Sequence, residues 1–439
     1  MGNLVVTRGK LEESKKWRLA VVVVAVVGMV VFAAVGYVLS REDDEEAQES
    51  TPISIVGSEL ATSSLVDHGS GTPSDPYVIT ELDVPIWGGY NVYGIVVSDV
   101  EDYLVLSGSL IHSTVDEYGP ILKGIRLYNS SKVTILDCTF EDLSAGIEIE
   151  SCENINISNN HFVDCFNGIN FNLYHSDDVS IYDNSFDGGG YGVVASGWED
   201  GIGCHQLSVI DNGFARGAHA LWVDDSDVVT IANNVVSHTE GTVFYLSYCS
   251  EAAVEANTIW DANAAAFSLF EASKVAIRDN HVNAGNLGVV IVQSSSVNVS
   301  DNDIQTSTGM SIRNSISVDL YHNFVSEATT GVWIADSKWV NITYCDISTS
   351  FVGIQLLSSG NDTTGVIVHH NNFMDDDISA IDNSDVNMWD DGVGAGNFWN
   401  DYTGVDGNSD GIGDTPREID DDSADRYPLM TPALLPGED

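Results

Sequence analysis

Residues 124–140 read GIRLYNSSKVTILDCTF, and residues 146–162 repeat the pattern as GIEIESCENINISNNHF. Each unit holds two short alternating segments, G-I-x-L and V-x-I-x-x-N-x-F, in which every second residue is apolar. Such alternation over four or five residues is typical of a β-strand with one buried face. The unit recurs about every 22 residues. A unit this short cannot form a domain alone, so neighbouring units must stack.

The same unit continues through most of the chain. Two or three short strands per unit can form one coil of a solenoid, whose strands pair with those of the next coil about 4.8 Å away. A leucine-rich repeat has a similar period, but its L-x-x-L-x-L-x-x-N signature is absent from the sequence. The repeat predicts an all-β parallel solenoid of about 12 coils. Further units start at Gly168, Gly192, Ala220, Thr242, Ala266, Gly288, Gly309, Gly331 and Gly353.

One column of the repeat, directly after the second strand, is almost uniform. Nine of its eleven positions are Asn and two are Cys. Stacked Asn side chains bond along a solenoid axis, and Asn tolerates the bend between strands. Cys is a small residue that buries well, so we assign the whole column a structural role. Its members are Cys138, Asn160, Asn184, Asn212, Asn234, Asn257, Asn280, Asn302, Asn323, Cys345 and Asn371.

The composition is strongly acidic, with 66 Asp or Glu against 16 Lys or Arg and a formal net charge of -50. Hydrophobic residues make up 43% of the chain, which is enough for a large core and excludes a disordered chain. So negative a charge repels nucleic acid and anionic lipid surfaces. It suits divalent cations or a saline medium, and no nucleic-acid partner is expected.

An apolar run without charge extends from Leu19 to Leu39, long enough to cross a bilayer as a helix. Basic residues precede the run and acidic residues follow it, which places the N-terminus in the cytoplasm and the rest outside. A cleaved signal peptide is the alternative, but the run is long and no clear cleavage site follows. We predict a single-pass plasma-membrane protein with an extracellular solenoid. The expected segments are a cytoplasmic stretch 1–18, a transmembrane helix 19–39, an acidic linker 40–52, an N-terminal cap 53–123, the repeats 124–390 and a C-terminal cap 391–439.

Cysteines and glycosylation sequons fit an extracellular chain without fixing its chemistry. The six cysteines are sparse and lack metal-type C-x-x-C spacing, which argues against a disulfide scaffold. Five sequons are candidate glycosylation sites, at Asn129, Asn156, Asn298, Asn341 and Asn361.

Two further stretches carry a family resemblance. Residues 69–80 read GSGTPSDPYVIT, and residues 397–430 read NFWNDYTGVDGNSDGIGDTPREIDDDSADRYPLM. With the repeats, they make residues 53–430 resemble the right-handed parallel β-helix proteins of the NosD-like and carbohydrate-binding and sugar-hydrolase type, in the variety found on archaeal surfaces. The resemblance implies a right-handed β-helix that handles carbohydrate. Copper is not expected, because no Met-rich or Cys/His cluster occurs.

The C-terminal segment contains a possible calcium loop. Oxygen side chains at positions 1, 3, 5 and 9, with Gly at position 6, resemble the front of such a loop. The twelfth position is Arg417 and not Glu, so the bidentate closing ligand is missing. The alternative is an acidic Gly-rich turn that serves a cap, with Trp399, Tyr402 and Tyr427 as apolar cover. The predicted ligands are Asp406, Asn408, Asp410, Ile412 and Asp414.

The outward face of the first strand is the second candidate site. Aromatic rings with nearby carboxylates suit a sugar chain, and Glu148 and Glu150, about 7 Å apart along a strand, fit a glycosidase pair. One exposed column is predicted to hold Arg126, Glu148, Asn170, Val194, Trp222, Phe244, Ser268, Val290, Ser311, Trp333 and Gln355. The parallel column would hold Tyr128, Glu150, Asn172, Ser196, Asp224, Leu246, Phe270, Val292, Arg313, Ala335 and Leu357.

Two function hypotheses follow from these sites. The first is a non-catalytic surface protein that binds glycan or serves as a structural module, with Trp222, Phe244, Asp224 and Trp333 as ligand contacts. The alternative is a calcium-assisted polysaccharide hydrolase or lyase on the same face, with Glu148, Glu150 and Asp224 as catalytic candidates. A third column, which contains Asp183, Asp211, Asp279, Asp301, His322, Tyr344 and His370, is interpreted as a solvated acidic edge.

Overall fold

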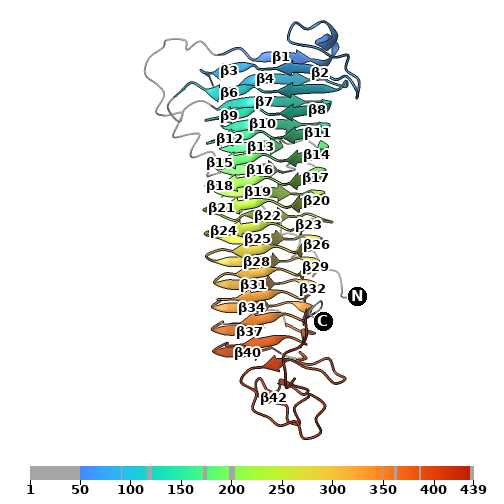
Figure 1. The fold of residues 1–439 in the computed structure, drawn as a ribbon, viewed down its shortest axis with the longest axis vertical. Coiled ribbons are helices and arrows are strands. Elements are labelled where there is room, and N and C mark those ends of the chain that lie inside the picture. The colour runs from blue at the N-terminus through green and yellow to red at the C-terminus, as the bar shows by residue number, and fades with distance from the viewer. Residues whose placement is uncertain are drawn as a thin grey trace, which may run out of the picture.

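The computed structural model describes residues 50–435, except 90, 116–120, 172–175, 197–202, 349, 360–362 and 385–386. Its strands stack in parallel into three long sheets that follow an elongated solenoid (Figure 1). Each coil contributes one strand to each sheet, so every third strand in the sequence is a neighbour in space. The predicted parallel solenoid is confirmed, with about 13 coils.

Three sheets, named here A, B and C, contain 14, 13 and 14 strands. Sheet A consists of β1 (Ile53–Val56), β4 (Val92–Ser98), β7 (Leu122–Tyr128), β10 (Ala145–Glu150), β13 (Asn167–Phe171), β16 (Tyr191–Ala195), β19 (His219–Asp224), β22 (Phe244–Ser247), β25 (Ala265–Phe270), β28 (Leu287–Val292), β31 (Thr308–Arg313), β34 (Thr330–Ala335), β37 (Val352–Leu357) and β40 (Ile378–Asn383). Sheet B consists of β2 (Tyr77–Thr80), β5 (Leu104–Ser107), β8 (Ser131–Leu136), β11 (Glu153–Ser158), β14 (Ser176–Tyr182), β17 (Cys204–Ile210), β20 (Asp227–Ala232), β23 (Ala253–Glu255), β26 (Ser273–Arg278), β29 (Ser295–Ser300), β32 (Ile316–Tyr321), β35 (Lys338–Thr343) and β38 (Ile367–His369). Sheet C consists of β3 (Asp83–Ile86), β6 (Leu110–Ser113), β9 (Thr139–Glu141), β12 (His161–Val163), β15 (Ser185–Asp187), β18 (Gly213–Ala215), β21 (Val235–Ser237), β24 (Thr258–Trp260), β27 (His281–Asn283), β30 (Asp303–Gln305), β33 (Phe324–Ser326), β36 (Asp346–Ser348), β39 (Asn372–Met374) and β41 (Phe398–Trp399).

Two smaller features lie near the ends. A short 3-10 helix, η1 (Gly57–Thr62), follows the first strand, and an antiparallel pair, β42 (Arg417–Glu418) and β43 (Ala424–Asp425), lies in the C-terminal segment. In residues 50–435, gaps apart, no helix is long and apolar enough to span a membrane. The predicted transmembrane helix at 19–39 lies outside the described residues.

The core is a set of apolar columns inside the solenoid. Alternate residues of each strand point inward, and the register stacks like positions of successive coils. Phe140, Phe162, Phe186 and Phe214 form one such column, with ring centroids 4.7 to 4.8 Å apart and nearly parallel planes. Full burial of each ring stabilises the fold by roughly 1.5–3 kcal/mol.

The glycines of the G-I-x-L motif make room for this aromatic column. A Cβ atom added at Gly146 would lie 2.7 Å from Phe162 Cδ1 and 2.7 Å from the carbonyl oxygen of Gly168. Real Cβ atoms do not approach other heavy atoms so closely. The motif therefore requires Gly where the strand of sheet A crosses the phenylalanine stack.

The predicted Asn column forms a buried ladder of hydrogen bonds, interrupted at Cys345. The Oδ1 atom of each Asn accepts the backbone N–H and the Nδ2–H of the Asn in the preceding coil, as between Asn160 and Asn184 at 2.9 and 3.0 Å. The Nδ2 groups also donate to backbone carbonyls, such as that of Ile135. The ladder extends one coil further than predicted, because Asn397 accepts from Asn371 in the same way.

A second ladder of small residues lies at the corner after sheet A. Here a serine hydroxyl accepts the backbone N–H of the preceding coil, as from Cys152 to Ser176 at 3.2 Å and from Cys204 to Ser226 at 3.0 Å. All six cysteines are buried free thiols. Sequence reasoning missed this ladder because Ser, Cys and Ala alternate within it.

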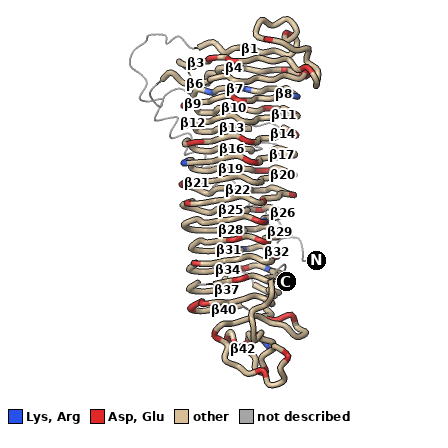
Figure 2. Tube along the Cα trace, viewed as in Figure 1, with Lys and Arg blue, Asp and Glu red and all other residues tan. Residues whose placement is uncertain are grey.

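Left-handed backbone at the corners accounts for part of the acidic composition. Asp183, Asp211, Asp279 and Asp301 all have φ between 55° and 58°, and His322, Tyr344 and His370 continue the same column with φ between 53° and 58°. Asp and Asn adopt this region more readily than other non-Gly residues. The third predicted column is therefore a corner of the backbone. Figure 2 shows acidic residues along the whole stack of coils.

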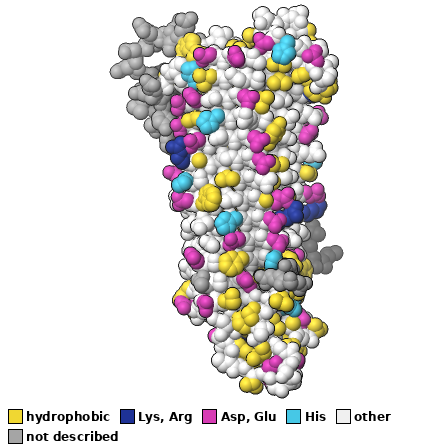
Figure 3. All heavy atoms as spheres, viewed as in Figure 1, with side chains coloured by type: hydrophobic (Ala, Val, Ile, Leu, Met, Phe, Trp, Pro, Cys, Tyr) yellow, Lys and Arg dark blue, Asp and Glu magenta, His cyan; other side chains and the backbone are white. Residues whose placement is uncertain are grey.

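Exposed hydrophobic side chains are present but scattered. Trp339, Phe166 and Phe351 are more than half exposed. On the face that Figure 3 presents, such side chains are separated by polar and acidic ones. The surface in that view therefore lacks one large apolar patch.

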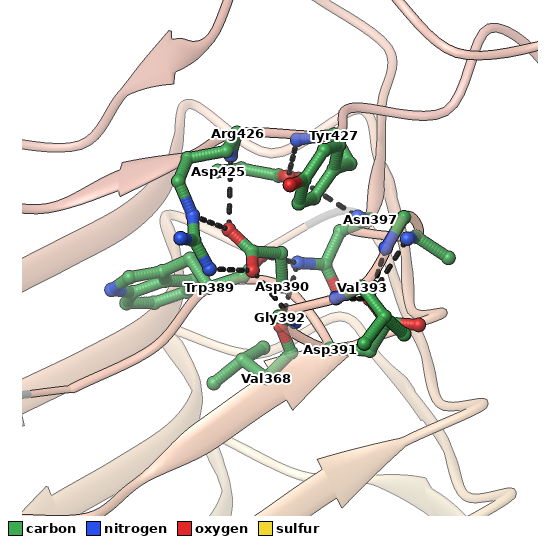
Figure 4. A network of polar contacts seen from close by, with 12 residues as sticks. Val368, Trp389, Asp390, Asp391, Gly392, Val393, Asn397, Asp425, Arg426 and Tyr427 are labelled. Atoms are coloured by element: carbon green, nitrogen blue, oxygen red, sulfur yellow. Dashed lines mark hydrogen bonds and ion pairs between the residues drawn. The ribbon is translucent and has the colours of Figure 1, made fainter.

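The C-terminal segment closes the end of the core. Trp399 lies on Phe373, with centroids 4.2 Å apart and planes 4° from parallel, and its Nε1–H donates to Asp425 at 2.7 Å. Arg426 pairs with Asp390 beside it (Figure 4). Burial raises the pKa of Asp425 to about 6. Trp399 is thus the apolar cover that the sequence predicted.

A buried carboxyl at the turn before β40 makes stability depend on pH. One oxygen of Asp376 accepts the N–H of Ser350 at 2.8 Å, and the other is buried without a partner in the described structure. Burial, with the charges of Asp375 and Asp377, raises the pKa of Asp376 to about 7 from an ordinary 3.8. The protonated form thus favours the folded state, and stability is lost as pH rises from about 4 through 7.

Asp376→Asn is expected to raise the free energy of unfolding at pH 8 by about 1–2 kcal/mol, since partial exposure screens the shift. At pH 4 the two proteins should be equal. Urea unfolding at both values checks this. An equal gain at both values would contradict the assignment, and Asp319→Asn, at an exposed position of sheet B, is the control.

Candidate functional site

The outer face of sheet A carries the richest set of functional side chains in the described structure. Its strands present outward columns whose register is fixed by strand pairing. The column of Arg126 continues through Glu148, Asn170, Val194 and Trp222. A neighbouring column runs from Lys123 through Ala145 and Asn167 to Tyr191 and His219.

The structure corrects two members of the predicted columns. Phe244 pairs with Leu221 in the core and is 0% exposed, and the outward partner of Trp222 is Tyr245. Likewise Leu246 is buried, and Ser247 pairs with Asp224. The coil between Trp222 and Tyr245 is one residue longer than the common period, and a slip of one residue reverses which face a side chain takes. The predicted placement of Phe244 on the ligand face is therefore wrong.

Four rings form an aromatic cluster on this face: Tyr191, His219, Trp222 and Tyr245. Trp222 stacks on Tyr245 with centroids 4.2 Å apart, and His219 stacks on Tyr191 at 4.8 Å. Trp222 meets the other two rings edge-on at 6.0 and 6.1 Å. All four are half-buried. Together they present a cluster of aromatic surface that includes two groups able to exchange protons, His219 and Tyr191.

The imidazole of His219 is held in one neutral tautomer. Its Nδ1 lies 2.8 Å from the carbonyl oxygen of Thr242, and a carbonyl only accepts, so Nδ1 carries the proton and Nε2 has the lone pair. Burial lowers the pKa of His219, although this hydrogen bond opposes the effect. A Cβ atom added at Gly241 would lie 2.8 Å from Nε2. Gly241 therefore leaves room for the proton-accepting edge of the ring.

Tyr191 and Asp224 complete the surroundings of this cluster. Burial raises the pKa of the Tyr191 phenol, so the hydroxyl stays protonated at neutral pH and can donate. Asp224 lies on the predicted outward column and accepts a hydrogen bond from Ser247. The arrangement places a base, an acid and a ring platform within adjacent coils.

A second cluster lies nearer the N-terminus on the same face. Lys123 pairs with Glu148 at 2.7 Å, and Arg126 pairs with Glu150 at 2.5 Å. The Tyr93 hydroxyl donates to Glu148 at 3.1 Å and accepts from Lys123 at 3.3 Å. Burial alone would lower the pKa of Lys123, but the hydrogen bond and charge of Glu148 outweigh it and raise the pKa. We call this set the charged cluster.

The predicted carboxylate pair is less accessible than its columns suggested. Glu148 is 0% exposed and Glu150 is 6% exposed, so the expectation that both lie on an open surface is wrong. Each is neutralised by a cation of the neighbouring coil. The pair is therefore better suited to fixing Lys123 and Arg126 than to attacking a glycosidic bond.

Trp333 lies on the predicted outward column, further toward the C-terminus. The guanidinium carbon of Arg313 lies 5.2 Å from the centroid of its ring. Trp333 pairs in register with Ser311 and Gln355. This pair is separated from the aromatic cluster by several coils.

The predicted calcium ligands form a tight turn in the C-terminal segment. Asp406 accepts the backbone N–H groups of Asp410 and Gly411, and Asp410 accepts that of Ile412. Asn408 also accepts from Asp410, and Asp414 accepts from Gly407. Gly411 has φ of 88°, as a sharp turn at that position requires. Among residues that the structure describes, no three acidic, His or Cys side chains converge as a metal site.

The predicted sequons occupy outward positions where they are described. Asn156, Asn298 and Asn341 lie on sheet B with their side chains outside the core, and Asn129 is exposed at a corner. The fifth sequon, Asn361, lies outside the described residues, as does Asn172 of the predicted outward column. Attached glycans remain a prediction.

Three parallel sheets wound in successive coils define a parallel β-solenoid. The profile of the right handed beta helix region family matches residues 89–186, 167–325 and 219–373, which together extend over more than half of the chain. The chain belongs to this family of right-handed β-helix proteins. The finer resemblance to NosD-like and archaeal members remains a prediction.

Solved structures share the fold at low sequence identity. The A-module of a mannuronan C-5 epimerase from Azotobacter vinelandii has 14% identity and a TM-score of 0.48, over 71% of this chain and 86% of that one. A periplasmic alginate epimerase has 13% identity and a TM-score of 0.50, over 75% and 83%. A mannuronic-acid-specific lyase from human gut microbiota has 11% identity and a TM-score of 0.46, over 76% and 91%. No curated protein sequence matches the chain. The fold is therefore shared with the periplasmic alginate epimerase.

Proposed function

We propose that the protein acts on a polysaccharide at the outer face of sheet A, with Trp222 and Tyr245 binding a sugar ring and His219 and Tyr191 transferring a proton. The observation that carries this is the neutral His219, locked in one tautomer beside a stacked aromatic platform. Sugar rings present apolar faces that pack on aromatic rings. A general base works best when its pKa lies near the working pH.

Removal of a carbon-bound proton fits the cluster better than hydrolysis. Hydrolysis by two carboxylates needs one carboxylic acid and one free carboxylate, whereas Glu148 and Glu150 are buried in ion pairs. In elimination or epimerisation, Nε2 of His219 would take the proton and the Tyr191 hydroxyl would supply one to the leaving oxygen or back to carbon. Such a proton is acidic enough only beside a carboxyl group, so the polymer would contain uronic acid units.

The strong negative charge of the chain opposes an anionic polymer at long range. Salt weakens this repulsion, since the Debye length falls to about 3 Å at 1 M ionic strength. Binding should therefore strengthen as salt rises. This dependence is opposite in sign to that of a basic polysaccharide-binding surface.

His219→Gln should slow turnover by about 100-fold or more, since it removes the base and keeps a polar side chain. The measurements are absorbance of unsaturated ends for elimination and uptake of deuterium from D2O for epimerisation, with polymannuronate and polygalacturonate as substrates. Trp222→Ala should weaken binding about tenfold. His281→Gln, on sheet C, is the matched control. Full activity of His219→Gln would contradict the proposal.

A non-catalytic glycan-binding role is the second candidate, because the Trp222–Tyr245 stack is sufficient for binding without chemistry. The same experiment separates the two roles. Binding that needs Trp222, without turnover of either polymer by the natural protein, favours the second role.

We also propose the extracellular, membrane-anchored location that the sequence of residues 1–52 indicates. The acidic surface and the outward sequons support it. Protease treatment of intact cells should then release the solenoid. Protection of the solenoid in intact cells would contradict this location.

Calcium binding at residues 406–414 is proposed from the ligand spacing and the left-handed Gly411. If calcium binds, it should raise the melting temperature of the natural protein and not of Asp410→Ala. Magnesium is the control cation. An unchanged melting temperature in millimolar calcium would leave the segment as a hydrogen-bonded turn.

A further inference from the structure

We propose that Trp333 and Arg313 form a second sugar subsite, and that one polymer chain lies along sheet A across both this pair and Trp222. The inference rests on the proposed function. It adds that the polymer lies along the solenoid axis, that it must be long enough to contact both tryptophans, and that it is acidic. Its basis is that the two tryptophans share one outward column of the sheet.

The register links the two tryptophans without interruption. Trp222 pairs with Tyr245, and the column then passes through Ser268, Val290 and Ser311 before it reaches Trp333. The path is five strand spacings long, about 24 Å. A straight polymer along the solenoid axis can therefore contact both rings.

The side chains between the platforms leave the path open. Beyond Tyr245, the column holds only Ser268, Val290 and Ser311, all half-buried. No large side chain of this column stands between Tyr245 and Trp333 in the register of the described strands. Two hydroxyl groups along the path can bond to a sugar chain.

Arg313 gives the second subsite a preference for acidic sugar. Its guanidinium lies over the Trp333 ring, and the side chain is exposed. Arg126 and Arg278 are each paired with a glutamate, whereas Arg313 forms no ion pair within the described residues. A guanidinium binds carboxylate through two parallel hydrogen bonds. The subsite thus fits a uronate whose sugar ring packs against the Trp333 indole and whose carboxylate binds the Arg313 guanidinium.

Two subsites joined by one polymer predict a length threshold. An oligosaccharide too short to reach both rings contacts one subsite at a time. Once both are reached, the second contact is intramolecular, and affinity rises without any new type of contact. The threshold should fall where the oligosaccharide becomes about 24 Å long.

The test is calorimetry of the full-length protein with size-graded oligomannuronates and, for charge, size-matched β-1,4-mannosides. We expect affinity to rise at least tenfold above the threshold, and more for mannuronates than for mannosides. Trp333→Ala should abolish the rise and leave short oligomers bound only at the Trp222 subsite. Arg313→Gln should remove the difference between acidic and neutral ligands. Trp339→Ala, an exposed tryptophan on sheet B, is the control and should change nothing.

The outcomes separate this inference from the proposed function. A length threshold that persists in Trp333→Ala overturns the second subsite while Trp222 still matters. Equal affinity of Arg313→Gln and the natural protein for mannuronates overturns the acidic preference. Unaltered binding in Trp222→Ala at every length overturns the proposed site itself.

Discussion

Replacing Asn234 by Ala is expected to lower the free energy of unfolding by about 3–5 kcal/mol, since it leaves several buried polar groups unsatisfied. Asn234 lies in the middle of the Asn ladder and is 0% exposed. Its Oδ1 accepts the backbone N–H of Asn212 at 3.0 Å and the Nδ2–H at 3.2 Å. Its Nδ2 donates to Val209 at 2.9 Å and to Asn257 at 3.0 Å. Alanine removes all four bonds, and water has no access to replace them.

Urea unfolding followed by circular dichroism measures this loss. Asn283→Ala is the control, because Asn283 is an exposed residue of sheet C and the change there should cost less than about 0.5 kcal/mol. The converse change is Cys345→Asn. Cys345 interrupts the ladder with a long contact of 3.9 Å from Asn323, so Asn at this position should stabilise the protein. Equal losses at 234 and 283 would mean that the ladder contributes nothing beyond ordinary surface hydrogen bonds.

Lys123→Met is expected to cost about 3 kcal/mol of stability, because it leaves the buried Glu148 carboxylate without its ammonium partner. The Lys123 head retains some contact with solvent, with 17% of the side chain exposed, whereas the Glu148 side chain has none. Glu148→Gln should therefore be the milder change, since water can still reach the unpaired ammonium. The two variants differ in expected cost because Glu148 is more deeply buried than Lys123, since both changes remove the same ion pair.

A double-mutant cycle completes this test. Lys123→Met combined with Glu148→Gln removes both charges, and the pair should be less destabilised than the sum of the single variants by at least about 1 kcal/mol. Strictly additive losses would show that the two charges do not interact in solution. Lys274→Met is the control, since Lys274 and its partner Glu251 are both mostly exposed.

The parts of the fold that repeat were accessible from the sequence, and the parts that break the repeat were not. Asn160 and its equivalents recur at one position because the ladder needs an amide in every coil. Phe244 was misplaced because the coil before it contains one extra residue, which a fixed period of 22 does not register. Asn397 was missed because the segment before it departs from the strand pattern.

The extent to which outward-facing side chains are buried was the second feature that could not be predicted from the sequence. Glu148 and Trp222 share a column and therefore look alike in the sequence, yet one is 0% exposed and the other half-exposed. The tautomer of His219 depends on a carbonyl of the next coil, at Thr242. The sequence of one repeat does not show which groups of the next coil its side chains will contact. Of the four rings in the aromatic cluster, only Trp222 was thus predicted.

The constant step between coils also bears on how such a protein changes over evolutionary time. Duplication or deletion of one whole coil between Tyr245 and Trp333 would keep both rings facing outward and would alter their separation by one strand spacing. Neither platform would need to be rebuilt, because each is made by its own coils. The ligand length that the protein prefers would then change in steps of one coil. Each step would come from the gain or loss of a repeat and would need no change to a binding pocket.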